Sequence, residues 1–237
     1  MALERQLGFF GKRAHVIGIA RSGIAAAEIL RSVGASVIMH DQKNAPQLDD
    51  GLNQVRKMGL EVRTGDEAYE GIEHADLVIT SPGVPHTCPG LITTKEHGIL
   101  IMSEIEFAYR IAPAPIIAIT GTNGKTTTTA MIGDILKAQG RQVYVAGNII
   151  AGEIRLPLSR AAYRSSASDI IVAEISSFQL EWISTFKPKV AALLNISADH
   201  MDRHTSLGDY ADTKARIFEC QDSEDIAILN ADDPRVM

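Results

Sequence analysis

PIIAITGTNGKTTTT, residues 115–129, places an apolar run of β-branched residues directly before a glycine-rich turn and a helical pattern. Apolar runs of this kind are typical of strands that are covered on both faces. Gly121 and Gly124 let the backbone turn tightly, so that its N–H groups and the N-terminus of the next helix can face an anion. The stretch therefore predicts a phosphate-binding loop, in which Lys125 reaches the β- and γ-phosphates and the Thr126 hydroxyl holds Mg²⁺.

One position of this loop departs from the usual pattern of phosphate-binding loops. That pattern has a glycine five residues before the second glycine, where this chain has Ile119. A tight turn that only caps a helix therefore stays an alternative, although Gly-Lys-Thr after a buried strand has few purely structural uses. The residues predicted to bind ATP are Gly121, Thr122, Asn123, Gly124, Lys125, Thr126 and Thr127.

The composition is that of a globular protein, and it limits the classes of partner. The 237 residues, 45% hydrophobic and 22% charged, suffice for one large domain or two ordinary ones. The net charge of -6 argues against nonspecific nucleic-acid binding, and no run approaches the ~18 apolar residues of a membrane span. The only two cysteines, Cys88 and Cys220, cannot build a disulfide framework. We therefore predict a soluble, cytoplasmic protein with no membrane insertion and no nucleic-acid partner.

A second nucleotide signal lies near the N-terminus. An apolar strand at residues 15–20 runs into Gly18-Ile-Ala-Arg-Ser-Gly23, and a second strand, Ser36–Asp41, ends on an acidic residue. This spacing resembles the dinucleotide fingerprint, with Ala20 where a middle glycine would let the pyrophosphate approach closely. Bound NAD is therefore disfavoured. A related nucleotide such as a UDP-sugar stays open, with Asp41 placed to meet its ribose or base.

Strands and helices alternate along the chain on both sides of one break. The break is Ala112-Pro-Ala-Pro115, where two prolines interrupt the pattern, and we place a boundary there between residues 1–112 and 113–237. Alternation on each side predicts an α/β fold of two units with mainly parallel sheets. The other predicted elements are helices at 44–58 and 104–111 and strands at 61–63, 76–80, 99–102, 142–146, 170–175, 190–196 and 225–229.

Polar residues follow three strands of the second unit at their carboxyl ends, where parallel sheets bind ligands. They are Asn148, Glu174, Ser176, Asp199 and His200. A carboxylate that ends an apolar strand, as Glu174 does, is costly unless it is paired or bound to a metal. It is either the partner of a lysine or arginine or the carboxylate that holds the Mg²⁺ of ATP.

Two further residues have competing interpretations. His200 lies between Asp199 and Asp202 in a loop at the active end of the sheet, which favours a ligand or substrate role over a purely structural hydrogen bond. Lys214 lies in an amphipathic helix at residues 210–218, and composition alone predicts an ordinary exposed lysine there.

Several stretches together resemble the Mur ligase family, the ATP-dependent amide-forming enzymes of peptidoglycan synthesis. They are GTNGKTT (121–127), AGN (146–148), EISSFQLE (174–181), NISADHMDRH (195–204), YADTKARIF (210–218) and NADD (230–233). In the first unit, Gly18–Gly23, Asp41 and Ser81-Pro-Gly83 match the family's uridine-diphosphate site. The SSFQLE run resembles the member that adds D-glutamate rather than its sister ligases.

The resemblance implies an activity and its substrates. ATP phosphorylates the terminal carboxylate of UDP-N-acetylmuramoyl-L-alanine, and the amine of D-glutamate then attacks the acyl phosphate. The catalytic residues carried over from the family are Lys125, Glu174, His200 and Lys214. The family has two Mg²⁺ sites, the first at Thr126 and Glu174 and the second at His200 and a carbamylated Lys214. The residues carried over for the UDP-substrate are Gly18, Arg21, Ser22, Asp41, Ser81, Gly83, Asn148 and Ser176.

The family also has three domains and nearly twice this length. The resemblance therefore implies a UDP-binding Rossmann-like parallel-sheet domain over residues 1–112 and an incomplete P-loop ATPase-type α/β domain over residues 113–237. The C-terminal glutamate-binding domain would be absent. We accordingly expect little or no ligase activity from this chain alone, and a monomer for the full-length form.

Three other functions stay open. A sister Mur ligase or a folylpolyglutamate-synthase-like ligase would share the phosphate site and differ in the acceptor. A noncatalytic nucleotide-binding fragment is separated by calorimetry with UDP-sugar and with Mg-ATP, because a ligase fragment should keep the UDP site of its first domain. A NAD-dependent dehydrogenase is disfavoured by Ala20 and would leave the phosphate-binding loop unused.

Overall fold

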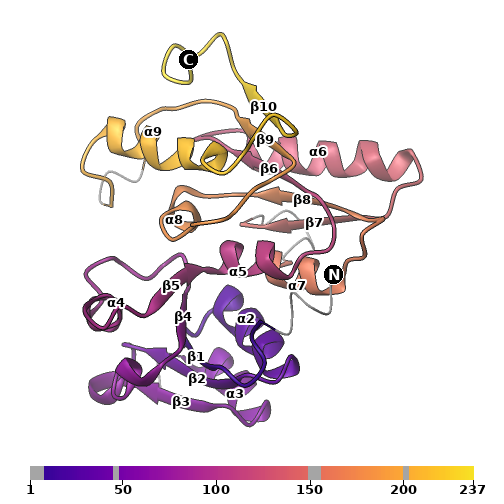
Figure 1. Ribbon diagram of the computed structural model, residues 1–237. Helices are drawn as coiled ribbons and strands as arrows, with labels where there is room; N and C mark the ends of the chain where they lie inside the picture. Colours follow the sequence, from indigo (N-terminus) through magenta and orange to yellow (C-terminus); the bar gives the residue numbers. More distant parts are fainter. Residues whose placement is uncertain (1–7, 45–47, 149–155, 200–202) are drawn as a thin grey trace.

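The computed structural model describes residues 8–44, 48–148, 156–199 and 203–237. These residues form two five-stranded sheets, and every strand pair in both sheets is parallel. Figure 1 shows the first sheet in the lower half of the molecule and the second sheet in the upper half. The α/β class predicted from the alternation of strands and helices is confirmed.

The first sheet has the strand order β3-β2-β1-β4-β5. The chain adds β2 and β3 on one side of β1 and then returns to add β4 and β5 on the other side, so the strand order reverses between β1 and β4. Ligands of open parallel sheets bind at the carboxyl ends of the strands at such a reversal. The strands are β1 (Arg13–Ile17), β2 (Ser36–Asp41), β3 (Glu61–Thr64), β4 (Leu77–Thr80) and β5 (Leu100–Ser103); the helices are α2 (Arg21–Ser32), α3 (Asp49–Lys57), α4 (Pro89–Glu96) and α5 (Glu104–Ile111).

The second sheet has the order β10-β9-β6-β8-β7, with β6 at its centre. Ile119 on β6 pairs in register with Glu174 on β8, which brings the end of β8 beside the phosphate-binding loop that follows β6. The strands are β6 (Ile116–Thr120), β7 (Val143–Gly147), β8 (Ile170–Glu174), β9 (Val190–Leu193) and β10 (Ile226–Leu229); the helices are α6 (Lys125–Ala138), α7 (Leu158–Arg164), α8 (Ser177–Leu180) and α9 (Leu207–Ala215).

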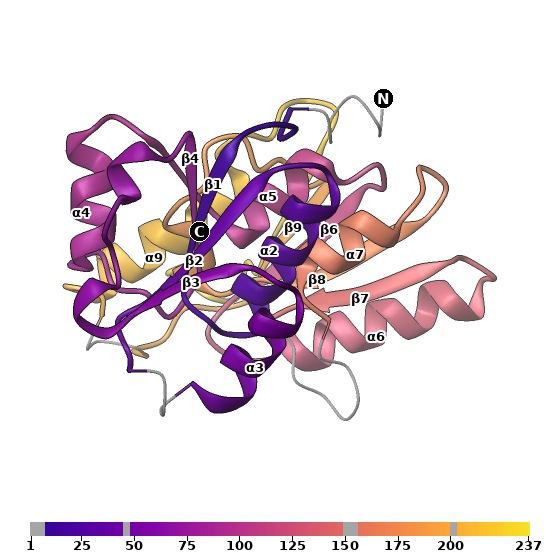
Figure 2. The same cartoon turned by 90° about the horizontal axis from the view of Figure 1, so that it is seen from below.

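Helix α5 joins the two halves and packs against α7, as the view from below shows (Figure 2). Phe107 and Ile111 of α5 are fully buried and belong to the same apolar core as Ala161 and Ala162 of α7. An ion pair between Glu28 on α2 and Arg160 on α7 crosses the same boundary. The two halves therefore share one continuous apolar core.

Several predicted elements have different bounds in the structure. The strand Ser36–Asp41 and the helix at 104–111 have the predicted bounds, whereas the strand predicted at 190–196 ends at Leu193. The helix predicted at 44–58 runs from Asp49 to Lys57, and residues 45–47 lie outside the described residues. Three short helices, α4, α7 and α8, were not predicted from the sequence.

Candidate functional site

The phosphate-binding loop needs its two glycines for different reasons. Gly121 has a φ of 147°, and a Cβ there would lie 3.0 Å from the Cβ of Leu194. Gly124 has a φ of 83° and precedes α6 without any side-chain cap. The N–H groups in the first turn of a helix have no acceptor within the helix. Among the residues that the structure describes, they are therefore available to an anion at the start of α6.

Asn195 holds this loop in shape. Its Oδ1 accepts the backbone N–H of Asn123 at 2.8 Å, and its Nδ2 donates to the carbonyl of Asn123 at 3.0 Å. Its own carbonyl accepts the N–H of Thr122 at 3.0 Å. Because these two loop N–H groups already have acceptors, a phosphate would be bound by the groups that follow them. Asn195 belongs to the stretch NISADHMDRH, but its position in that stretch does not predict a contact with the loop.

Glu174 faces the start of α6. The Thr126 hydroxyl donates to Glu174 Oε2 at 2.7 Å, and Asn148 Nδ2 donates to Oε1 at 3.4 Å. Glu174 is 3% exposed, and in the described part of the chain no lysine or arginine forms an ion pair with it. A hydroxyl beside a buried carboxylate without a cationic partner is a donor set that suits a hard cation such as Mg²⁺.

A metal site made of protein side chains alone is not seen in the described residues. No three histidine, cysteine, aspartate or glutamate side chains gather there as a metal-binding group. His200, which the sequence analysis gave a metal role, lies outside the described residues. Phosphate oxygens would therefore have to complete the coordination of a cation at Thr126 and Glu174.

Two lysines donate to neighbouring carbonyls of the loop. Lys125 Nζ donates to the carbonyl of Thr122 at 2.8 Å, and Lys214 Nζ donates to the carbonyl of Gly121 at 2.9 Å. Lys214 is 1% exposed and lies over the ring of Tyr210, so the exposed position predicted from composition is wrong. Burial, and next the positive charge of Lys125, lower the pKa of Lys214 to about 7. A substantial share of its amine is therefore neutral near pH 7.

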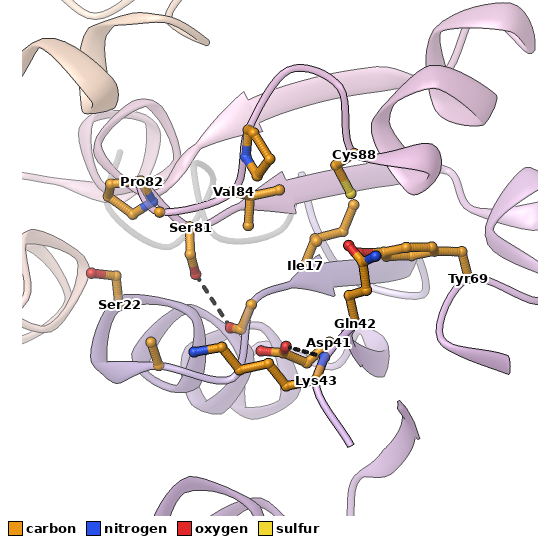
Figure 3. Close-up of a pocket in the computed structure, with 14 residues that line it drawn as sticks. Ile17, Ser22, Asp41, Gln42, Lys43, Tyr69, Ser81, Pro82, Val84 and Cys88 are labelled. Atoms are coloured by element: carbon orange, nitrogen blue, oxygen red, sulfur yellow. Dashed lines mark hydrogen bonds between the residues drawn. The ribbon is translucent and has the colours of Figure 1, made fainter. Parts of the chain in front are cut away.

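A cavity of about 430 Å³ lies at the reversal point of the first sheet (Figure 3). Asp41 accepts the N–H groups of Ile19 at 2.8 Å and Lys43 at 3.0 Å. The Ser81 hydroxyl donates to the carbonyl of Gly18 at 3.2 Å, and a Cβ on Gly18 would lie only 2.7 Å from the Cβ of Ser81. Of the residues predicted for the UDP-substrate, five line this cavity: Gly18, Ser22, Asp41, Ser81 and Gly83.

The other three predicted UDP-substrate residues lie elsewhere. Arg21 lines a neighbouring cavity of about 310 Å³ with Arg160, because its side chain leaves α2 on another side. Asn148 contacts Glu174 in the second sheet. Ser176 is the N-cap residue directly before α8, and its N–H and hydroxyl both donate to Gln179 Oε1. The structure thus divides the predicted set between the two sheets.

Several residues that line the cavity of the first sheet were not predicted from the sequence. Gln42 and Lys43 follow β2 directly, so their place after a strand that ends on an acid could have been noticed. Tyr69 and Cys88 come from irregular segments, and no sequence pattern marks them. Burial raises the pKa of the Tyr69 hydroxyl.

In the ranges that the structure describes, no helix has both the length and the apolar character to cross a bilayer.

Comparison with protein families identifies the chain. A sequence model of the Mur ligase middle domain matches residues 119–237, and one of the MurD-like N-terminal domain of Mur ligases matches residues 12–103. The chain belongs to the Mur ligase family. The first match contains the phosphate-binding loop and Glu174, and the second contains the cavity of the first sheet.

Curated relatives of this Mur ligase chain share nearly half of its residues. A UDP-N-acetylmuramoylalanine–D-glutamate ligase of Thermoanaerobacter pseudethanolicus is 46% identical over 224 residues, which are 94% of this chain and 48% of the relative. A protein of the same name from Pelotomaculum thermopropionicum is 46% identical over 226 residues, 95% of this chain and 49% of the relative. The chain thus spans about half the length of the curated relatives it matches.

Solved Mur ligase structures share the fold. The UDP-N-acetylmuramate:L-alanyl-gamma-D-glutamyl-meso-diaminopimelate ligase of Neisseria meningitides has a TM-score of 0.60 at 20% identity, covering 95% of this chain and 73% of that one. The UDP-N-acetylmuramate-alanine ligase of Thermotoga maritima has a TM-score of 0.57 at 21% identity, covering 94% and 50%. At these identities the likeness concerns the fold alone.

Proposed function

We propose that this Mur ligase chain provides the UDP-substrate and ATP sites of a ligase that joins D-glutamate to UDP-N-acetylmuramoyl-L-alanine in the cytoplasm, in peptidoglycan synthesis. The shared name of the curated relatives supports the choice of substrates. The observation that carries the proposal is the contact of 2.7 Å between the Thr126 hydroxyl and Glu174 at the end of a phosphate-binding loop. We assign residues 1–112 to the UDP-substrate and residues 113–237 to ATP.

The proposed reaction has two steps. A carboxylate oxygen of the UDP-substrate attacks the γ-phosphorus of ATP, the bond to the bridging oxygen breaks, and ADP leaves. The amine nitrogen of D-glutamate then attacks the carbonyl carbon of the acyl phosphate, inorganic phosphate leaves, and the nitrogen loses its proton to solvent. Phosphoryl transfer of this kind depends mostly on positioning and charge neutralisation.

The residues of the second sheet supply that positioning. Lys125 lies 2.8 Å from a loop carbonyl and would exchange this contact for the β- and γ-phosphates of ATP. The free N–H groups at the start of α6 would bind phosphate oxygens, while Thr126 and Glu174 would hold Mg²⁺. Bound Mg²⁺ would neutralise the charge that develops between the β- and γ-phosphates.

A second Mg²⁺ site is part of the proposal and involves Lys214 and His200. A neutral amine can add CO₂ to become a carbamate, whose oxygens bind hard cations as a carboxylate does. The pKa of Lys214, lowered to about 7 by burial and the charge of Lys125, leaves such an amine available. Asn148 and Ser176, on the Glu174 side of the molecule, would contact the muramoyl-alanine part of the substrate.

Isothermal titration calorimetry tests the proposal on this chain. We expect the chain to bind UDP-N-acetylmuramoyl-L-alanine. We also expect it to bind AMP-PNP, a hydrolysis-resistant form of ATP, in the presence of Mg²⁺. Lys125→Met should weaken AMP-PNP binding at least about 10-fold, or about 1.4 kcal/mol. Lys137→Met, a substitution in the last turn of the same helix, is the matched control and should leave the affinity unchanged. The proposal would be refuted if neither ligand bound.

The open alternatives give different results in further assays. A sister ligase would prefer another UDP-muramoyl substrate in a binding panel, and a noncatalytic nucleotide-binding fragment would not distinguish among them. The expectation that residues 1–237 alone have little ligase activity stays a prediction. Phosphate release that depends on D-glutamate would contradict it.

A further inference from the structure

Arg203 connects the second half of the chain to the wall of the first-sheet cavity. Val84 forms part of that wall (Figure 3), and its carbonyl accepts a hydrogen bond of 2.8 Å from Arg203 Nη2. The same guanidinium donates from Nε to Glu181 Oε1 at 3.1 Å and from Nη2 to Glu181 Oε2. The side chains of Arg203 and Glu181 are only 14% and 5% exposed. Screening of this ion pair by solvent is therefore weak.

Glu181 adds a second contact to the same wall. His86, two residues beyond Val84, has its Nε2 3.0 Å from Glu181 Oε2. Glu181 itself follows α8, the helix that begins just after Glu174 (Figure 1). The segment 84–86 of the first half is therefore held by a carboxylate whose own position depends on the end of β8.

On its other side, Arg203 reaches the phosphate-binding loop through packed rings. Its guanidinium lies 4.7 Å from the ring centre of Phe178, and the ring of His204 stacks on Phe178 at 5.9 Å. His204 also contacts Tyr210, with the ring centres 5.0 Å apart. The ring of Tyr210 lies under Lys214, whose amine binds the loop carbonyl of Gly121. Contacts thus run without a gap from the cavity wall to the loop.

An arginine suits this junction because its planar fork can hold a carboxylate at two points and still donate to a carbonyl. A lysine has one charged nitrogen and could not keep the same set of directions. Without Arg203, the buried carboxylate of Glu181 would lose its bidentate partner. The Val84 carbonyl would lose its hydrogen bond from the second half of the chain.

We propose that Arg203 is a positioning residue that couples the first-sheet cavity to the phosphate-binding loop, so that occupancy of one raises the affinity of the other. This rests on the proposed function, which assigns a nucleotide to each place. A ligand against the wall at Val84 fixes the guanidinium, and the guanidinium in turn fixes Phe178 and the segment after Glu174. The first ligand therefore bears the cost of ordering this path, and the second ligand binds more tightly.

Calorimetry with two short ligands tests the coupling. UDP is the probe for the cavity, because it lacks the muramoyl-alanine part that could touch ATP directly, and AMP-PNP with Mg²⁺ is the probe for the loop. Each dissociation constant is measured alone and with the other probe saturating. In the unmodified protein we expect UDP to tighten AMP-PNP binding at least about 5-fold, with the same factor in the reverse direction, because coupling is reciprocal.

Variants decide whether Arg203 carries the coupling. The coupling ratio is the dissociation constant of one probe alone divided by its dissociation constant with the other probe saturating. For Arg203→Met this ratio should lie within about 2-fold of one while both probes still bind. Arg203→Lys keeps the charge but not the planar guanidinium, and its coupling ratio should fall by more than half. This variant serves as the test if Arg203→Met does not fold. Arg141→Met, at an exposed arginine in the loop after α6, is the matched control and should keep the full ratio.

Two results would overturn the inference. One is an unmodified protein that binds both probes with a ratio within about 2-fold of one. The other is a folded Arg203 variant that keeps the full ratio. Failure of the proposed function would look different, because then UDP or AMP-PNP would not bind at all. Thermal unfolding of each variant shows which of them are folded.

Discussion

Glu106 of α5 offers the sharpest test of how the two halves are joined. Its carboxylate is fully buried and accepts the backbone N–H groups of Ser184, Thr185 and Phe186, at 2.8 to 3.2 Å. The hydroxyls of Ser184 and Thr185 and the Nε of Arg110 donate to it as well. The Glu106 carboxylate, on the helix that leads to the boundary, thus accepts hydrogen bonds from the turn at residues 184–186 in the second half.

The replacement Glu106→Gln keeps the shape and removes the charge. One of the two acceptor oxygens becomes an NH₂ group that faces N–H donors, so about two of the hydrogen bonds to a charged group are lost. Each such bond contributes about 1.5–3 kcal/mol. Breaking one member of a buried charged network costs about 3–5 kcal/mol. We therefore expect the free energy of unfolding to fall by about 3–5 kcal/mol.

Urea denaturation followed by circular dichroism measures the loss. For an m-value of about 3 kcal/mol/M, the midpoint should fall by about 1–2 M. Glu96→Gln, at an exposed glutamate that ends α4, is the matched control and should change the free energy of unfolding by less than about 0.5 kcal/mol. A change below about 1 kcal/mol for Glu106→Gln would refute the reasoning, because surface substitutions approach that size.

The difference in stability between the unmodified protein and Glu106→Gln should depend on pH. Burial alone would raise the pKa of Glu106, but the hydrogen bonds from Thr185, Ser184 and Arg110 outweigh it, and the folded-state pKa is lowered. A lowered carboxyl pKa means that the stabilisation is complete above the unfolded-state pKa of about 4.3 and is lost as the pH falls through the folded-state value. The stability difference between the two proteins should therefore shrink below about pH 4. A difference that stays constant down to pH 3 would contradict a charged Glu106.

Three further predictions concern other sites. Asn195→Ala should weaken binding of AMP-PNP with Mg²⁺ about 10-fold in calorimetry, because the loop N–H of Asn123 loses its acceptor and the loop its shape. Burial lowers the pKa values of His15 and His40 to about 4. As the pH falls from 6.5 to 4, these histidines are protonated in the unfolded state before they are protonated in the folded state, so the free energy of unfolding should fall over this range. His15→Gln should reduce this fall, as measured by urea titrations at each pH. With ¹³C-bicarbonate, the unmodified protein should give a carbamate resonance that Lys214→Arg lacks, and its absence at pH 8 would count against a carbamylated lysine.

The fold was predictable from the sequence where local signals agree. The helix at Glu104–Ile111 has an N-cap in Ser103, acids in its first turn, Arg110 in its last turn and a proline soon after its end, so every local preference gives the same bounds. The strand at 190–196 was predicted too long because apolar residues continue past Leu193. There Asn195 turns its backbone and side chain to the phosphate-binding loop, a tertiary contact that no local pattern records.

The candidate site was predictable to a similar degree. The loop glycines, Thr126 and Glu174 follow from strand ends and motif spacing, because parallel strands bring their carboxyl ends together. The burial of Lys214 was not predictable from composition, because it depends on how α9, which carries both Lys214 and Tyr210, packs against Gly121. Only the family resemblance singled out that lysine, whereas nothing in the sequence gave Arg203 a role.

The central claim is that a triphosphate and its magnesium bind between the start of α6 and Glu174. The most direct measurement is the dissociation constant of AMP-PNP with Mg²⁺ and with EDTA, for the unmodified protein and for Glu174→Gln. We expect Mg²⁺ to tighten binding at least about 10-fold in the unmodified protein and to have little effect in the variant, which cannot offer a charged oxygen. Equal Mg²⁺ dependence in the two proteins would contradict the account.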